Sequence, residues 1–190
     1  MEERRYQIEQ YRSNFSEVSN SEDKQFPLIQ DTSVVLYNVD KLATRFCKEY
    51  RNGEAYSSCD AFYETGKDDR FILFEFKDQP ESNIDFKDLS KKAIDSSALL
   101  LLSWFSRRNA NDVRRLVELF VIYARQDKNA QAYQKGINGF RPLMSKNQKE
   151  PVLFGLDTYE GTFYSEVHTL TKDAFYKNYW KKLFGSDPPV

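Results

Sequence analysis

The sequence predicts a mixed α/β fold, in which helices flank a sheet that has both parallel and antiparallel strands. Three observations favour this class: an amphipathic helical pattern, two β-prone runs joined by a short polar turn, and a second helical pattern that leads into another β-prone run. A strand reached through a helix usually joins its sheet by a parallel crossover, whereas a short turn makes an antiparallel hairpin. With 190 residues, 40% of them hydrophobic, the chain has enough apolar material for one domain of ordinary size.

The N-terminal segment, residues 1–25, is polar and charged, and we expect it to be flexible. A short helix over Glu2–Tyr11 and a mobile linker over Arg12–Lys24 fit its composition. The rest of the chain is predicted to be one domain, with these bounds: residues 26–190, with a core at 39–124 and a C-terminal extension at 151–185.

The first helical pattern follows Asn38, whose side chain is expected to cap it. Ser33–Tyr37, just before it, is either a short strand or a lead-in to the helix. The helix is predicted to run to about Tyr50, because apolar residues recur at helical spacing along one face: Val39, Leu42, Ala43, Phe46, Cys47 and Tyr50.

The β-prone runs Cys59–Thr65 and Arg70–Lys77 flank a polar turn and predict a hairpin. Folding the chain about that four-residue turn pairs Thr65 with Arg70 and, counting back, Asp60 with Glu75. Directly opposed residues share a face of the sheet, with Cβ atoms roughly 4.5–5.5 Å apart. Lys77 lies two residues beyond Glu75, so it returns to that face. Two carboxylates and one ammonium group are therefore expected to converge.

Asp60, fourteen intervening residues and then Glu75-Phe76-Lys77 form a pattern that resembles the PD-(D/E)xK nuclease superfamily. Restriction endonucleases and archaeal Holliday-junction resolvases belong to it. The resemblance covers roughly Val39–Tyr123, and Cys59 stands where the superfamily name has proline. It implies a restriction-endonuclease-like α-β-β-β-α-β core, whose early strand would fall around Glu54–Ser58.

The resemblance also implies a metal site. Asp60 and Glu75 would hold Mg²⁺ or Mn²⁺, with the Phe76 carbonyl as a further ligand. Lys77 would position the attacking water and neutralise charge that develops on the phosphate. Glu49, on the helix before the hairpin, is a candidate third acidic ligand, with Glu54 a weaker one; a solvated helix glutamate is the alternative. For the whole cluster, the alternative is a half-buried ion pair at a strand end.

The second half of the chain is predicted to complete the sheet and to add a C-terminal strand pair and helix. The expected elements, in order, are a helix over Phe86–Ser106, a crossover strand over Leu116–Ala124, a loop over Gln126–Glu150, strands over Val152–Leu156 and Thr162–Thr169, and a helix over Lys172–Phe184 capped by Thr171. His168, the only histidine, more often has a structural role in such an aromatic-rich setting.

Charge is distributed unevenly along the chain. Residues 1–100 hold 20 acidic and 14 basic side chains, whereas residues 101–150 hold 4 acidic and 10 basic ones. A metal site in the acidic half with a basic flank suits a nucleic-acid enzyme. The basic residues that we expect to contact a phosphate backbone are Lys91, Lys92, Arg114, Arg115 and Arg141. Solvated surface cations are the alternative.

Two functions follow from these patterns. The first is metal-dependent hydrolysis of phosphodiesters in DNA or RNA by Asp60, Glu75 and Lys77. The second is a catalytically inactive module of the same fold that binds protein or nucleic acid, since fold alone does not carry activity. A protein partner or a homodimer is compatible with both. With no apolar signal-like segment and two cysteines without metal-ligand spacing, the protein is expected to be cytoplasmic and to have no membrane partner.

Overall fold

The described part of the protein is built on one mixed sheet. The computed structural model describes residues 9–20, 26–50, 56–66, 70–103, 116–125 and 151–189. Its six strands lie side by side in chain order: β1 (Arg12–Ser13), β2 (Leu36–Asn38), β3 (Ala61–Glu64), β4 (Phe71–Pro80), β5 (Val117–Arg125) and β6 (Glu166–Thr171). Neighbours from β1 to β4 are antiparallel, whereas β4, β5 and β6 are parallel. The predicted mixed α/β class is confirmed.

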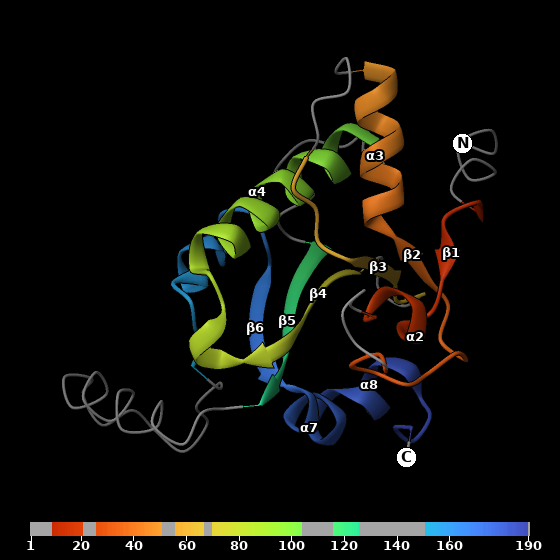
Figure 1. Ribbon diagram of the computed structural model, residues 1–190, viewed down its shortest axis with the longest axis vertical. Coiled ribbons are helices and arrows are strands. Elements are labelled where there is room, and N and C mark those ends of the chain that lie inside the picture. The colour runs from red at the N-terminus through yellow and green to blue at the C-terminus, as the bar shows by residue number, and fades with distance from the viewer. Residues whose placement is uncertain are drawn as a thin grey trace.

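Helices cover both faces of this sheet (Figure 1). Helices α3 (Val39–Tyr50) and α4 (Phe86–Ser103) pack on one face. Helix α2 (Phe15–Val18), helix α7 (Lys172–Phe175) and the π-helical turn η3 (Tyr176–Trp180) pack on the other, next to α8 (Lys181–Phe184). Two short 3₁₀ turns, η1 (Glu81–Asn83) and η2 (Leu156–Tyr159), complete the regular structure. Within the ranges described, no helix has both the length and the apolar character that a membrane crossing needs.

The hairpin has the register that turn length and side-chain alternation predicted. Ala61 pairs with Phe74, and the Thr65 amide donates to the Arg70 carbonyl over 3.1 Å. The same register places Asp60, one residue before β3, opposite Glu75, and the Asp60 amide donates to the Phe74 carbonyl over 2.9 Å. This part of the prediction is confirmed.

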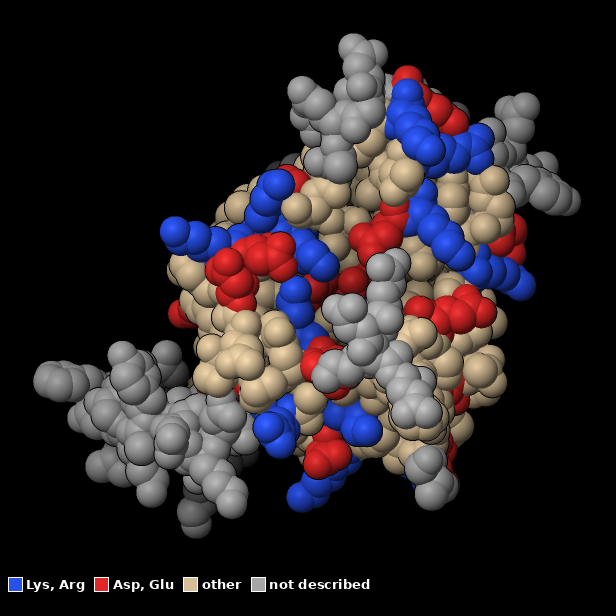
Figure 2. Space-filling view, viewed as in Figure 1, with Lys and Arg blue, Asp and Glu red and all other residues tan. Residues whose placement is uncertain are grey.

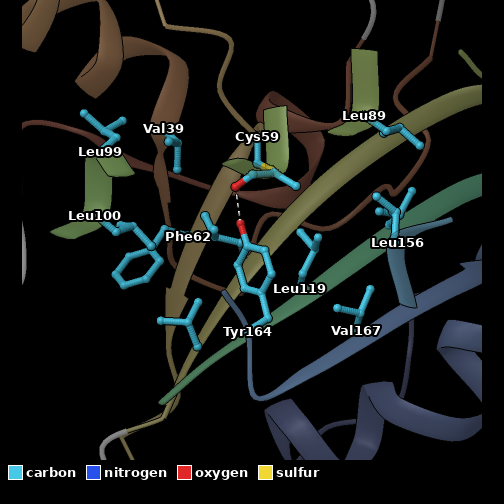
Figure 3. Close-up of a cluster of buried hydrophobic side chains, with 14 of the residues drawn as sticks. Val39, Cys59, Phe62, Leu89, Leu99, Leu100, Leu119, Leu156, Tyr164 and Val167 are labelled. Atoms are coloured by element: carbon cyan, nitrogen blue, oxygen red, sulfur yellow. Dashed lines mark hydrogen bonds between the residues drawn. The ribbon is translucent and has the colours of Figure 1, made fainter. Parts of the chain in front are cut away.

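Alternation along β4 divides its side chains between two hydrophobic cores. Phe71 and Leu73 face the core under α3 and α4, whereas Ile72 and Phe74 face the core under α2 and α7. Glu75 and Lys77 continue the first series and therefore point toward α4. In that first core, Tyr164 reaches up to the helix and donates a 2.5 Å hydrogen bond to the Ala93 carbonyl (Figure 3).

Helix α3 begins as predicted, but the strand beside the hairpin is not the expected one. The Asn38 side chain accepts a hydrogen bond from the Lys41 amide, which is a helix cap. Residues 56–58 form no strand, and residues 51–55 lie outside the described ranges. The amides of Tyr56 and Ser57 donate to side chains, to Cys47 Sγ and Asp95 Oδ2, so they are not available to a ladder. Instead β2, which precedes α3, pairs with β3.

The expectation of a mobile linker over Arg12–Lys24 is wrong for its first part. Arg12–Ser13 forms β1, and α2 follows, with the Asn14 side chain accepting from the Glu17 amide. Phe15 is fully buried. The physical reason is that one aromatic ring anchors an otherwise polar segment: it lies within 5.1–6.4 Å, between centroids, of the rings of Phe74, Phe76, Phe175, Trp180 and Phe184.

The C-terminal part contains one predicted strand, at Glu166–Thr171 rather than Thr162–Thr169, and lacks the other. The strand predicted over Val152–Leu156 is absent because Phe154 and Gly155 both have a φ near +60°, which turns the chain away from an extended path. The segment still lies beside β6, since the Leu153 amide donates to Thr169 Oγ1. The last helical segment begins as predicted, at Thr171, whose side chain accepts from the Ala174 amide, and it ends at Gly185.

Candidate active site

Four charged side chains from the hairpin and from α4 meet on one face of the sheet. Asp60 precedes β3, Glu75 and Lys77 lie on β4, and Lys92 reaches down from α4. The first three are the residues that the sequence pattern predicted to converge. Lys92 was expected to contact a phosphate, yet its ammonium group lies inside this cluster.

Asp60 is held in place by three backbone contacts. Its amide donates to the Phe74 carbonyl, and its own carbonyl accepts from the Val39 amide at the start of α3, over 3.1 Å. Its Oδ2 accepts from the Phe76 amide over 2.6 Å, leaving Oδ1 directed toward Lys92. The carboxylate is therefore fixed between the hairpin and α3, with 17% of the side chain exposed.

Glu75 is the buried centre of the cluster. Only 2% of its side chain is exposed, and its Oε1 lies 2.8 Å from Lys92 Nζ and 3.1 Å from Lys77 Nζ. Its Oε2 is also buried and has no hydrogen-bond partner among the described residues. A buried carboxylate oxygen without a partner is costly, by about 1–3 kcal/mol or more for a charged group, so native proteins usually assign such an atom a ligand or a role.

Burial is the largest influence on the pKa of both acids. Burial, followed by the charge of Glu75, raises the pKa of Asp60 well above its usual range. Burial also raises the pKa of Glu75, although the two neighbouring ammonium groups act in the opposite direction. Both carboxylates are thus destabilised as anions, and additional positive charge would stabilise them.

The pKa values of the two lysines are both raised, which favours their charged forms. Burial lowers the pKa of Lys77, but Glu75 and a hydrogen bond to Asp88 outweigh it and raise the pKa overall. Burial also lowers the pKa of Lys92, but the charges of Glu75 and Asp60 outweigh burial and raise this pKa well above its ordinary value. Both side chains are therefore ammonium ions at neutral pH. Asp88, on the first turn of α4, accepts from Lys77 Nζ over 2.9 Å.

Several predicted site residues lie elsewhere. Glu49 is exposed and paired with Arg45 over 2.6 Å, one turn along α3, so it is not part of the cluster. Lys91 is exposed on α4. His168, for which a structural role was expected, lies on the opposite face of the sheet, with its ring tilted against that of Phe120. The predicted contacts that fall outside the described ranges are Glu54, Arg114, Arg115 and Arg141.

Two acidic residues near the cluster were missed. Asp88 was not predicted, because only basic residues of α4 were expected to belong to the site. Asp40, on the first turn of α3, is close enough to Asp60 to raise the pKa of that carboxyl, and it accepts a 2.5 Å hydrogen bond from Ser58 Oγ. It is a better candidate than Glu49 for the acidic residue expected on this helix. The sequence analysis did not predict the pairing of β2 with β3, which places the N-terminus of α3 beside Asp60.

The donor set is limited but suits a magnesium-like ion. Among the described residues, no three His, Cys, Asp or Glu side chains are arranged to hold a metal. Mg²⁺ is commonly held by only one or two carboxylates, with waters and substrate phosphate completing its shell. Asp60 Oδ1 and the unpartnered Glu75 Oε2 are oxygen donors of this kind, so the residues present fit such an ion.

The surface around the site carries charges of both signs. Figure 2 shows basic and acidic side chains alternating over α3 and α4, with acidic atoms in the recess between the two helices. The described residues on the visible face form no continuous basic field.

Comparisons with protein-family models, with curated proteins and with solved structures return no match to this chain.

Proposed function

We propose that the protein is a metal-dependent nuclease that hydrolyses phosphodiester bonds in DNA or RNA, with a restriction-endonuclease-like core. The observation that carries this proposal is the convergence of Asp60 and Glu75 beside Lys77, with a buried Glu75 oxygen that has no partner among the described residues. The parallel crossover from β4 through α4 to β5 also agrees with that core. The position of β2, before α3 in the chain, departs from it.

In this proposal the cluster divides its work among four groups. Asp60 and Glu75 hold Mg²⁺ or Mn²⁺, with the Phe76 carbonyl as a further ligand. When bound, such an ion polarises the scissile phosphate and makes a bound water more acidic. Lys77 is held by Glu75 and Asp88 at the edge of the site, where its charge offsets the negative charge that develops on the phosphate.

The test combines activity with metal binding. Purified protein is assayed on duplex, single-stranded and branched DNA and on RNA, with Mg²⁺ and with Mn²⁺, and its melting temperature is recorded with and without each ion. A native-state ligand raises the melting temperature. Asp60→Asn should remove both cleavage and most of the metal-dependent rise, whereas Glu64→Gln, an exposed carboxylate on the same hairpin, should change neither. A rise that is equal in Asp60→Asn would place the ion elsewhere.

A second function is favoured by one specific observation. Glu75 already has two ammonium partners, so the cluster is partly neutralised without any metal. A catalytically inactive module that binds protein or nucleic acid would keep such a cluster as a structural ion-pair network. Absence of metal binding and of cleavage on every substrate, together with a stable complex with one protein or nucleic acid, would favour this function.

A further inference from the structure

The position of Lys92 carries an inference about how the proposed metal site is regulated, and this inference rests on the proposed function. Lys92 Nζ lies 2.8 Å from Glu75 Oε1 and 3.8 Å from Asp60 Oδ1. It is thus a cation in contact with both carboxylates that would hold the metal. Lys77 touches only one of them and is also held by Asp88.

An ammonium group and a divalent ion cannot share this position. Mg²⁺ needs oxygen ligands at about 2.0–2.1 Å, which draws the two carboxylates closer together than an ammonium group allows. Like charges at such separation also repel strongly where water is scarce. We infer that Lys92 is a built-in counter-ion of both carboxylates, that it lies against Asp60 Oδ1, one of the two oxygens assigned to the metal, and that it must be displaced when a divalent ion binds.

The surroundings of Lys92 permit that exchange. Its side chain is 21% exposed, so the ammonium group has a route to solvent, and its four-carbon stem is flexible. Within the described ranges its ion pairs are those with Glu75 and Asp60. Glu75, 2% exposed, cannot move out in the same way. Lys92 is therefore the member of the cluster that yields.

This arrangement explains how two adjacent buried acids are tolerated without metal. Buried carboxylates need a counter-charge, and removing one partner of such a pair strongly destabilises the fold. Lys92 supplies that charge in the folded protein. A divalent ion then binds by displacing Lys92. Its affinity is therefore lower than it would be for the same two carboxylates without a counter-ion.

The experiment measures Mn²⁺ binding by titration calorimetry at pH 8, without nucleic acid, for four proteins: wild type, Lys92→Met, Lys91→Met and Asp60→Asn. Methionine keeps the length and packing of the lysine stem and removes its charge. We expect Lys92→Met to bind Mn²⁺ roughly ten- to hundredfold more tightly than wild type, the factor equivalent to one charge-assisted hydrogen bond. Lys91→Met, on the neighbouring exposed position, should match wild type, and Asp60→Asn should lose binding.

The outcomes separate this inference from the function on which it rests. If wild type binds Mn²⁺ through Asp60 and Lys92→Met binds no more tightly than Lys91→Met, the inference is wrong and the metal site stands. If neither wild type nor Lys92→Met binds, the metal-dependent function fails and the inference fails with it. If only Lys92→Met binds, Lys92 does occupy the site and the natural chain is not metal-dependent. Should Lys92→Met not fold, Lys92→Gln, which keeps a donor for Glu75, is expected to give the same tightening.

Discussion

Replacing Phe15 by alanine tests whether the N-terminal segment is part of the folded domain. Phe15 is fully buried among five aromatic rings, and its neighbours come from β4 and from the C-terminal helical segment. Truncating a buried Phe to Ala costs about 3–5 kcal/mol in other proteins. The burial of roughly 150–250 Å² per aromatic side chain, at about 25 cal/mol per Å², leads to a similar figure.

Phe26→Ala is the matched control, because Phe26 belongs to the same end of the chain and is 61% exposed. We expect urea unfolding, followed by circular dichroism, to show a loss of about 3–5 kcal/mol for Phe15→Ala. The control should stay within about 0.5 kcal/mol of wild type. For a chain of this length the loss corresponds to a melting temperature lower by roughly 6–20 °C. Equal unfolding curves for the two variants would mean that β1 and α2 are not docked as described.

Three further predictions concern the site and its support. Lys77→Ala should abolish cleavage yet keep the Mn²⁺-dependent rise in melting temperature, because Lys77 is not a metal ligand. Lys87→Ala, at an exposed position on α4, is the control. Loss of the rise in Lys77→Ala would refute the assignment of Lys77 to charge neutralisation alone. Because the pKa of Asp60 is raised in the folded state, the folded protein binds more protons than the unfolded chain from about pH 4 up to that raised pKa, and stability falls as pH rises through this window. Metal-free Asp60→Asn should therefore have a flatter stability profile from pH 4 to 8 and be more stable than wild type at pH 8; a steeper profile would contradict the sign. Tyr164→Phe removes the buried hydrogen bond to Ala93 and should lower the free energy of unfolding by about 1 kcal/mol, measured in urea, with no change expected if the bond is absent.

The hairpin could be predicted in detail because its information is local. A four-residue polar turn fixes which residues oppose each other, and the period of two fixes the shared face, so Asp60, Glu75 and Lys77 could be grouped from the sequence. The same is true of the caps at Asn38 and Thr171, since capping depends on residues within one turn.

Features that depend on distant packing could not be predicted in this way. Nothing local distinguishes Phe15 from Phe26, and only the aromatic core built by β4 and the C-terminal helical segment decides that one is buried. Lys92 likewise looks like any lysine on the polar side of a helix. Its place beside Glu75 depends on how α4 is rotated against the sheet, and the same rotation leaves the apolar Ile94 40% exposed.

The π-helical turn η3 has a consequence for the length of the chain. Residues five apart point in directions about 140° apart around a regular α-helix, whereas residues four apart differ by about 40°. Phe175 and Trp180 are five apart, yet both are fully buried with ring centroids 5.8 Å from each other, because the wider turn brings them to the same side. Deleting the exposed Lys177 would make the spacing four and restore a regular helix. This segment can therefore lose one residue and still direct the same rings at the sheet. The π-helical turn is thus what a single residue inserted into a regular helix would produce.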